Sequence, residues 1–90
     1  MSDGEDIQVL HIDDEPDFAH LTADMLERKE SQLTVETGTS ASAGLELLSD
    51  IKYDCIISDY DMPGMNGIEF LERVRESYPD LPFILYTGKG

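Results

Sequence analysis

Acidic residues follow two short apolar runs of this 90-residue chain. Asp13 and Asp14 come directly after the run Ile7–Ile12, and Asp59 ends the run that begins at Cys55. Carboxylates gathered at one place repel each other unless a cation joins them, and oxygen-rich negative sites suit Mg²⁺. A carboxylate is also a competent phosphoryl acceptor. These residue types therefore predict a Mg²⁺ site that serves phosphoryl transfer to Asp59.

Small and hydroxyl-bearing residues near the acids fit the same chemistry. Gly64 and Gly67 follow Asp59 and let the loop backbone approach a bound group closely. Thr87 ends the last apolar run, where its hydroxyl is able to donate a hydrogen bond to a phosphoryl oxygen. Each feature alone has a plain structural reading, because the chain holds 20 acids and threonine is a common strand residue. Their joint placement at the ends of apolar runs is more specific.

The elements that must position these groups alternate along the chain. Four apolar runs predict β-strands and three stretches with helical spacing predict α-helices. The expected strands cover 7–12, 33–37, 54–58 and 81–86, and the expected helices cover 16–30, 41–48 and 67–78. Pro16 suits a first helical turn, and Asn66 with Glu69 predicts a capping box. Alternation with short connections predicts parallel strands with right-handed crossovers.

The apolar spacing also predicts which helix faces are buried. The first helix has a single apolar stripe of Phe18, Leu21, Met25 and Leu26, and the third has one of Ile68, Leu71, Val74 and Tyr78. The core is expected to include Phe18, Phe70 and Phe83. The second strand is more polar than the others, which favours an edge position and the strand order 2-1-3-4. In that order the chain adds strands in opposite directions on either side of the gap between strands 1 and 3. Ligands bind at the carboxyl ends of the strands at that point. Asp13, Asp14 and Asp59 follow those strands.

Composition excludes several classes of partner. The net charge of −14 disfavours binding to nucleic acid or to an anionic membrane surface. The single cysteine, Cys55, allows no internal disulfide and fits a reducing cytoplasm. No apolar run approaches the ~20 residues of a membrane span. Acids spread along the whole chain suit high ionic strength, which predicts a salt-loving source. We expect residues 1–6 to be a disordered leader and 7–90 to form one domain.

Three segments together resemble the receiver domain of two-component response regulators, such as chemotaxis regulators. They are VLHIDDEP at 9–16, IISDYDMPGMNG at 56–67 and ILYTG at 84–88. The resemblance implies a flavodoxin-like, doubly wound α/β fold that accepts a phosphoryl group from a histidine kinase on Asp59. It implies a signalling domain rather than an enzyme, with an output or sensor module outside this chain. The acidic composition and the YTGKG ending resemble archaeal members, which suggests a haloarchaeal source.

The same resemblance implies a role for each site residue. Asp14 and Asp59 would bind Mg²⁺ directly, Asp13 would act mainly through water, and the backbone carbonyl of Asp61 would be a further ligand. Thr87 would supply the switch hydroxyl.

The chain departs from the family pattern at its C-terminal end. The family has a fifth strand that carries a lysine, and two more helices, whereas this chain stops after the fourth strand. Lys89 does not occupy that lysine's motif position, and Tyr86 is not the family's switch aromatic. We expect these 90 residues to be part of a longer protein, or the remainder to be disordered or supplied by another copy. The edge of strand 4 would then be open to dimerisation, and part of one sheet face would be bare.

One alternative function comes from another class. Asp59 and Asp61 resemble the Asp-x-Asp element of haloacid-dehalogenase-like phosphatases, in which the first acid is the nucleophile and the second a general acid. That element is usually followed by Thr or Val, but Met62 follows it here. A phosphatase would also leave Asp13 and Asp14 unexplained. His11 and His20 lack a second ligand at metal-binding spacing, which predicts structural roles for both.

Overall fold

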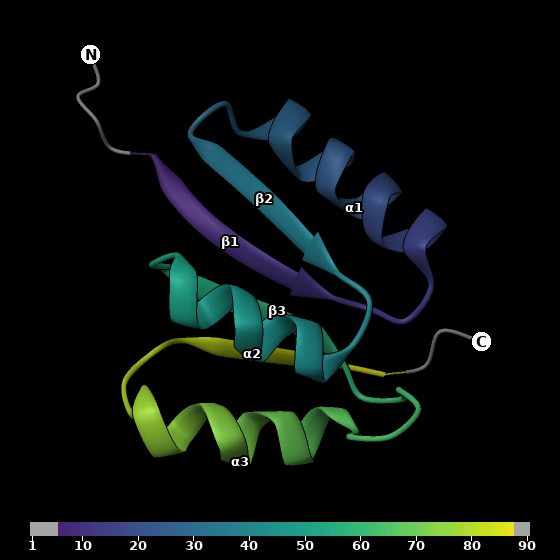
Figure 1. Cartoon of the computed structure of the whole chain (residues 1–90). Helices are drawn as coiled ribbons and strands as arrows, with labels where there is room; N and C mark the ends of the chain where they lie inside the picture. The colour runs from purple at the N-terminus through teal and green to yellow at the C-terminus, as the bar shows by residue number, and fades with distance from the viewer. Residues whose placement is uncertain (1–5, 88–90) are drawn as a thin grey trace.

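The computed structural model describes residues 6–87, in which strands and helices alternate (Figure 1). The elements are β1 (Ile7–Ile12), α1 (Pro16–Lys29), β2 (Leu33–Gly38), α2 (Ala41–Asp50), β3 (Cys55–Asp59), α3 (Gly67–Ser77) and β4 (Phe83–Tyr86). All seven predicted elements are present, with boundaries within about two residues of expectation. Of the predicted leader only Asp6 is described, and Lys89 also lies outside the described residues.

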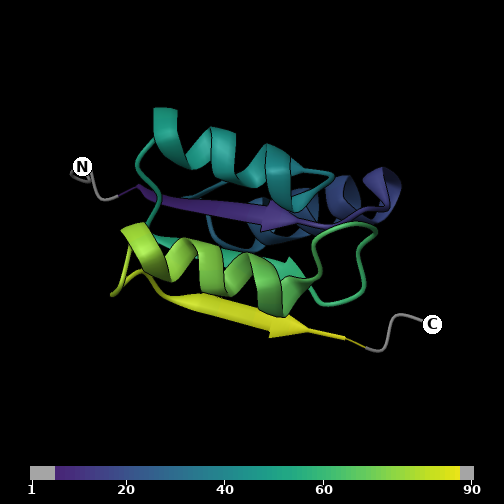
Figure 2. The ribbon, with the colours of Figure 1, turned by 60° about the horizontal axis from the view of Figure 1, so that its bottom comes forward.

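The four strands form one parallel sheet with the predicted order β2-β1-β3-β4. Figure 1 shows the arrows of β1 and β2 pointing the same way, and Figure 2 shows the same for β1, β3 and β4. In the register, Ile12 of β1 lies beside Ser58 of β3, and Asp59 lies beside Tyr86 of β4. The carboxyl ends of β1, β3 and β4 therefore meet at one edge of the sheet, as the sequence predicted.

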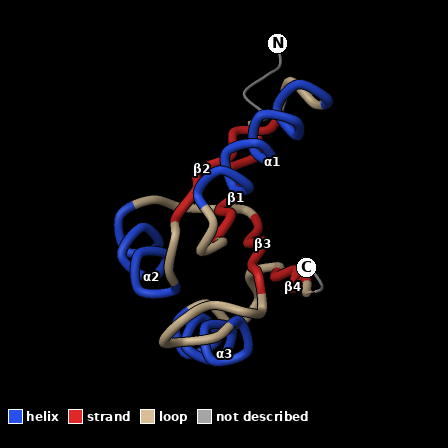
Figure 3. Tube along the Cα trace, turned by 90° about the vertical axis from the view of Figure 1, so that its right-hand side faces the viewer, coloured by secondary structure: helices blue, strands red, loops and turns tan. Residues whose placement is uncertain are grey.

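Helices cover both faces of the sheet, with α1 on one face and α2 and α3 on the other (Figure 3). The main core lies under α2 and α3. Leu10, Ile12 and Ile56 of the central strands pack there with Phe70 and Val74 of α3, and all five are fully buried. Because β1 and β3 are held rigidly by this core, the residues that follow them are held in place too.

The predicted inward face of α1 is partly wrong. Leu21 and Met25 are 56% and 53% exposed, and Phe18 is also exposed, whereas Ala19 and Ala23 are buried. These alanines are spaced by four residues, so they form an alternative face that lets the helix approach β2 closely. Small side chains therefore set the rotation of α1, and its larger apolar residues lie outside the contact.

The capping box of α3 was predicted correctly, but its apolar stripe was predicted only in part. Asn66 accepts from the backbone N–H of Glu69, and the Glu69 side chain accepts from the backbone N–H of Asn66, both at 2.9 Å. Ile68 belongs to the predicted apolar stripe but is exposed, whereas Phe70 and Val74 are buried, as predicted. The spacing of 70 and 74 is again four residues, so two stripes competed in the sequence.

Strand β4 lies at the edge of the sheet formed by the described residues, as expected. Its Ile84 is 53% exposed. This exposure agrees with the expectation of a bare sheet region, while dimerisation through β4 stays a prediction. Within residues 6–87, no helix has the length and apolar character to cross a membrane.

Candidate functional site

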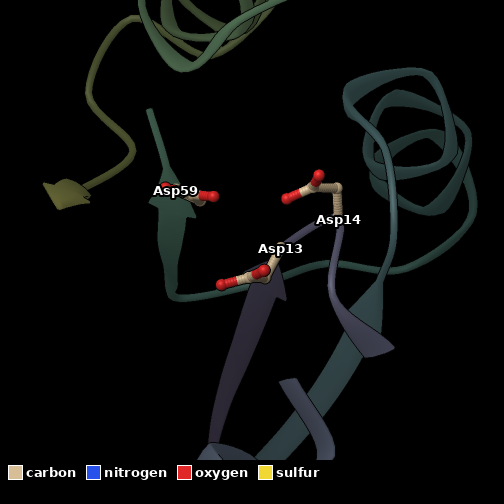
Figure 4. A group of neighbouring side chains, drawn as sticks. All are labelled: Asp13, Asp14 and Asp59. Atoms are coloured by element: carbon tan, nitrogen blue, oxygen red, sulfur yellow. The ribbon is translucent and has the colours of Figure 1, made fainter. Parts of the chain in front are cut away.

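The three predicted acids meet at the carboxyl edge of the sheet (Figure 4). Asp13 follows β1, Asp14 begins the loop to α1, and Asp59 ends β3. One carboxylate oxygen from each lies within 4.8 Å of the other two. The parallel register places Ile12 beside Ser58, so the next residues, Asp13 and Asp59, emerge side by side. The arrangement concentrates negative charge at a single point.

Burial makes this concentration of charge costly. Asp13 is fully buried, Asp59 is only 1% exposed, and Asp14 is half-buried. Buried carboxylates need hydrogen-bond donors or cations to replace water. The backbone N–H of Glu15 donates to Asp13 Oδ1 at 2.9 Å, and the N–H of Asp61 donates to Asp59 Oδ1 at 3.2 Å. A divalent cation would offset the remaining repulsion.

Tyr86 is part of this site, although no role was predicted for it. Its hydroxyl donates to Asp13 Oδ2 and lies 2.9 Å from Nε2 of His11. Burial, followed by the hydrogen bond to Asp13 and the nearby negative charges, raises the pKa of Tyr86 above its usual value. The alternation of side chains along the strands was the available signal, because it puts His11, Asp13 and Tyr86 on one face. His11 is buried and hydrogen-bonded, in keeping with its predicted structural role.

The loop after β3 needs glycine at both predicted positions. Gly64 has a φ of 79°, a conformation that favours glycine. A Cβ at position 67 would lie 2.6 Å from the carbonyl oxygen of Asp59 and 2.5 Å from Cδ1 of Leu85. Gly67 therefore allows the start of α3 to pack directly against the backbone of Asp59.

The two remaining predicted site residues lie at the same edge of the sheet as this cluster. Asp61 contacts Asp59 through its backbone N–H, but its side chain is exposed and does not belong to the cluster of three acids. Thr87 follows Tyr86, which lies beside Asp59 in the register, and its side chain is exposed. Both residues are therefore at the correct edge of the sheet. The ligand role of the Asp61 carbonyl and the switch role of Thr87 stay predictions.

Comparison with known proteins identifies the family. Residues 9–90 match the response regulator receiver domain, and the chain belongs to that family of phosphorelay signalling domains. It is 35% identical to a probable chemotaxis protein CheY of Rhizobium etli, across the whole chain and 70% of the relative. It is also 35% identical, over 93% of its length, to a protein-glutamate methylesterase/protein-glutamine glutaminase of Clostridium acetobutylicum. The chain spans about a quarter (24%) of that relative.

Solved structures agree with the predicted flavodoxin-like receiver fold. The response regulator protein TrrA of Thermotoga maritima, in complex with Mg²⁺-BeF, superimposes with a TM-score of 0.83 at 28% identity. The match covers 90% of this chain and 69% of that one. The phosphatase alternative finds no support, since the family match and the fold point to a receiver domain and Asp61 lies outside the acid cluster.

Proposed function

We propose that Asp59 accepts a phosphoryl group from a histidine kinase in a reaction that requires Mg²⁺. The observation that carries this proposal is the convergence of the Asp13, Asp14 and Asp59 carboxylates within 4.8 Å. These donors are all oxygens and strongly negative, so they fit Mg²⁺, which binds through one or two carboxylates plus water. The related TrrA structure with Mg²⁺-BeF supports the same choice of ion.

Each acid has a distinct part in the proposal. Asp14 and Asp59 hold the ion directly, Asp13 acts mainly through water, and the Asp61 backbone carbonyl is a further ligand. The ion, when bound, neutralises charge on the incoming phosphoryl group. The Asp61 N–H holds one oxygen of the buried Asp59 carboxylate in place.

The proposed chemical step is a simple transfer. A carboxylate oxygen of Asp59 attacks the phosphorus of a phosphohistidine, the P–N bond breaks, and its electron pair returns to the imidazole. The product is an acyl phosphate on Asp59. Thr87 donates from its hydroxyl to a phosphoryl oxygen, which links the end of β4 to phosphorylation. The chain is then a phospho-accepting signalling domain and does not turn over a substrate as an enzyme.

The proposal includes partners outside these 90 residues. The donor is a histidine kinase in the cytoplasm, and an output or sensor module reads the phosphorylated state. The length of the methylesterase relative leaves room for such a module, since the match with this chain covers only 24% of that relative. Residues 7–90 supply the receiver part, and the exposed edge of β4 is a candidate surface for dimerisation.

The test is phosphorylation of the full-length protein by phosphoramidate, followed by intact mass spectrometry. We expect a mass gain of one phosphoryl group that requires Mg²⁺ and is abolished by EDTA. Asp59→Asn should remove the gain, whereas Asp61→Asn, two residues away, should keep it because the Asp61 backbone is retained.

Two results would contradict the proposal. Labelling that persists in Asp59→Asn would point to another acceptor. Sustained release of phosphate from unrelated phosphate monoesters, lost in Asp59→Asn, would instead favour a phosphatase.

A further inference from the structure

A line of side-chain contacts crosses the sheet from its edge to the acid cluster. Tyr86 lies on β4, and β3 separates β4 from β1. The Tyr86 side chain nevertheless reaches Asp13 at the end of β1 and His11 within that strand. The residue thus joins two strands that do not pair with each other.

The direction of these hydrogen bonds follows from the number of protons. A phenol has one proton, and Tyr86 gives it to Oδ2 of Asp13. The hydrogen between Tyr86 and Nε2 of His11 must therefore belong to the imidazole, which donates across 2.9 Å. The order is His11 to Tyr86 to Asp13. The last bond ends on a carboxylate, and such charge-assisted bonds are stronger than neutral ones.

Both oxygens of Asp13 are consequently held by the protein. Oδ1 accepts from the backbone N–H of Glu15 at 2.9 Å, and Oδ2 accepts from Tyr86. Rotation of the Asp13 carboxylate would break at least one of these bonds. The side chain is fully buried, so water cannot readily replace a lost donor.

Tyr86 is itself fixed from several sides. Its ring centroid lies 5.9 Å from that of His11 and 6.4 Å from that of Phe18 on α1. Its backbone carbonyl accepts from the N–H of Tyr60 at 2.8 Å, directly after Asp59. A donor held this firmly is suited to fixing the orientation of its acceptor.

We propose that Tyr86 is a positioning residue that orients Asp13 for Mg²⁺ binding. This inference rests on the proposed function, because it assumes that the three acids bind Mg²⁺. Residues that orient metal ligands typically change metal affinity about 10- to 100-fold when they are lost. Since Asp13 is assigned a water-mediated contact, we expect the effect of losing the Tyr86 hydroxyl at the lower end of that range.

The experiment is isothermal titration of MgCl₂ into the full-length protein and its Tyr86→Phe variant. Tyr86→Phe should bind Mg²⁺ about tenfold more weakly than wild type. Tyr78→Phe is the matched control, because the Tyr78 hydroxyl donates to the Leu48 carbonyl at 2.9 Å, away from the acids. It should bind Mg²⁺ like wild type. Titrations are run at a temperature where thermal melts show all three proteins folded.

A second readout separates positioning from general damage. The phosphorylation rate of Tyr86→Phe should reach the wild-type value at saturating Mg²⁺, so only the Mg²⁺ concentration for half-maximal rate rises. Unchanged or tighter Mg²⁺ binding by Tyr86→Phe would overturn the inference and leave the proposed function intact. Absence of Mg²⁺ binding by the wild-type protein would overturn both.

Discussion

Asp59→Asn should stabilise the metal-free protein, although it removes the proposed phosphoryl acceptor. In the absence of a cation, three carboxylates with oxygens within 4.8 Å repel one another, and two of them are buried. The substitution keeps the size of the side chain and an oxygen that accepts from the Asp61 N–H. It removes two of the three repulsive pairs, those of Asp59 with Asp13 and with Asp14.

The size of the effect follows from the distance between the oxygens. At the upper limit of 4.8 Å, two unit charges repel by about 3.5 kcal/mol at an effective dielectric constant of about 20, and by about 0.9 kcal/mol in bulk water. Asp14 is half-buried, so its pair with Asp59 lies toward the lower value. The bond from Asp61 also weakens by about 1 kcal/mol when its acceptor loses its charge. The net gain in unfolding free energy should be about 1–3 kcal/mol, or roughly 5–15 °C in melting temperature.

The assay is thermal unfolding of both proteins in EDTA, followed by circular dichroism. Asp80→Asn is the matched control, since Asp80 is exposed and lies outside the acid cluster, yet its replacement changes net charge equally. The gain in Asp59→Asn should shrink only slightly in 1 M NaCl, because salt screens buried pairs much less than exposed ones. Mg²⁺ at ten times its dissociation constant should stabilise wild type by about 1.4 kcal/mol and close part of the difference.

A melting temperature of Asp59→Asn below that of wild type in EDTA would refute net repulsion of Asp59 within the acid cluster. That result would mean that the native hydrogen bonds of Asp59 outweigh its repulsion from the other two acids. An equal gain in Asp80→Asn would show that total charge, rather than the cluster, sets the stability.

Two further predictions concern other parts of the fold. Gly67→Ala should destabilise by about 1–3 kcal/mol in urea unfolding, because its Cβ would meet backbone. Gly64→Ala, with open space but a positive φ, should cost less, about 1 kcal/mol; equal costs would contradict the packing argument. Burial, and to a lesser extent the charge of Asp54, raises the pKa of the Cys55 thiol. The contribution of the protonated Cys55 thiol to folding stability is therefore complete below the unfolded pKa of about 8.5 and declines as pH rises. Cys55→Ala should consequently lose less stability than wild type between about pH 8 and 10. Identical pH profiles would refute this.

The sequence predicted the acid cluster because few features decide it. Asp13 and Asp59 each end an apolar run, and a parallel sheet brings the carboxyl ends of its strands to one edge. The polar character of the second strand was enough to choose the strand order, and that order makes the two acids neighbours. Local patterns and one rule of topology therefore sufficed to place these side chains.

Helix rotation could not be predicted in the same way. The first helix contains a stripe of large apolar residues and a second stripe with Ala19 and Ala23. Periodicity favours the larger side chains, but close approach to β2 favours the smaller ones. Which stripe faces the sheet depends on the distance between layers, and the sequence pattern does not contain that distance.

The sequence pattern could not predict the contact between Tyr86 and Asp13 either. This contact bears on the part that Asp13 plays in the site. It spans an intervening strand, so it depends on side-chain reach rather than on register. With Tyr86 on one oxygen and the Glu15 N–H on the other, each carboxylate oxygen of Asp13 accepts a hydrogen bond from the protein. Asp59 accepts the longer backbone bond, at 3.2 Å, from the loop that Gly64 and Gly67 shape. The two bonds to Asp13 fit its proposed place as a fixed part of the metal site around Asp59.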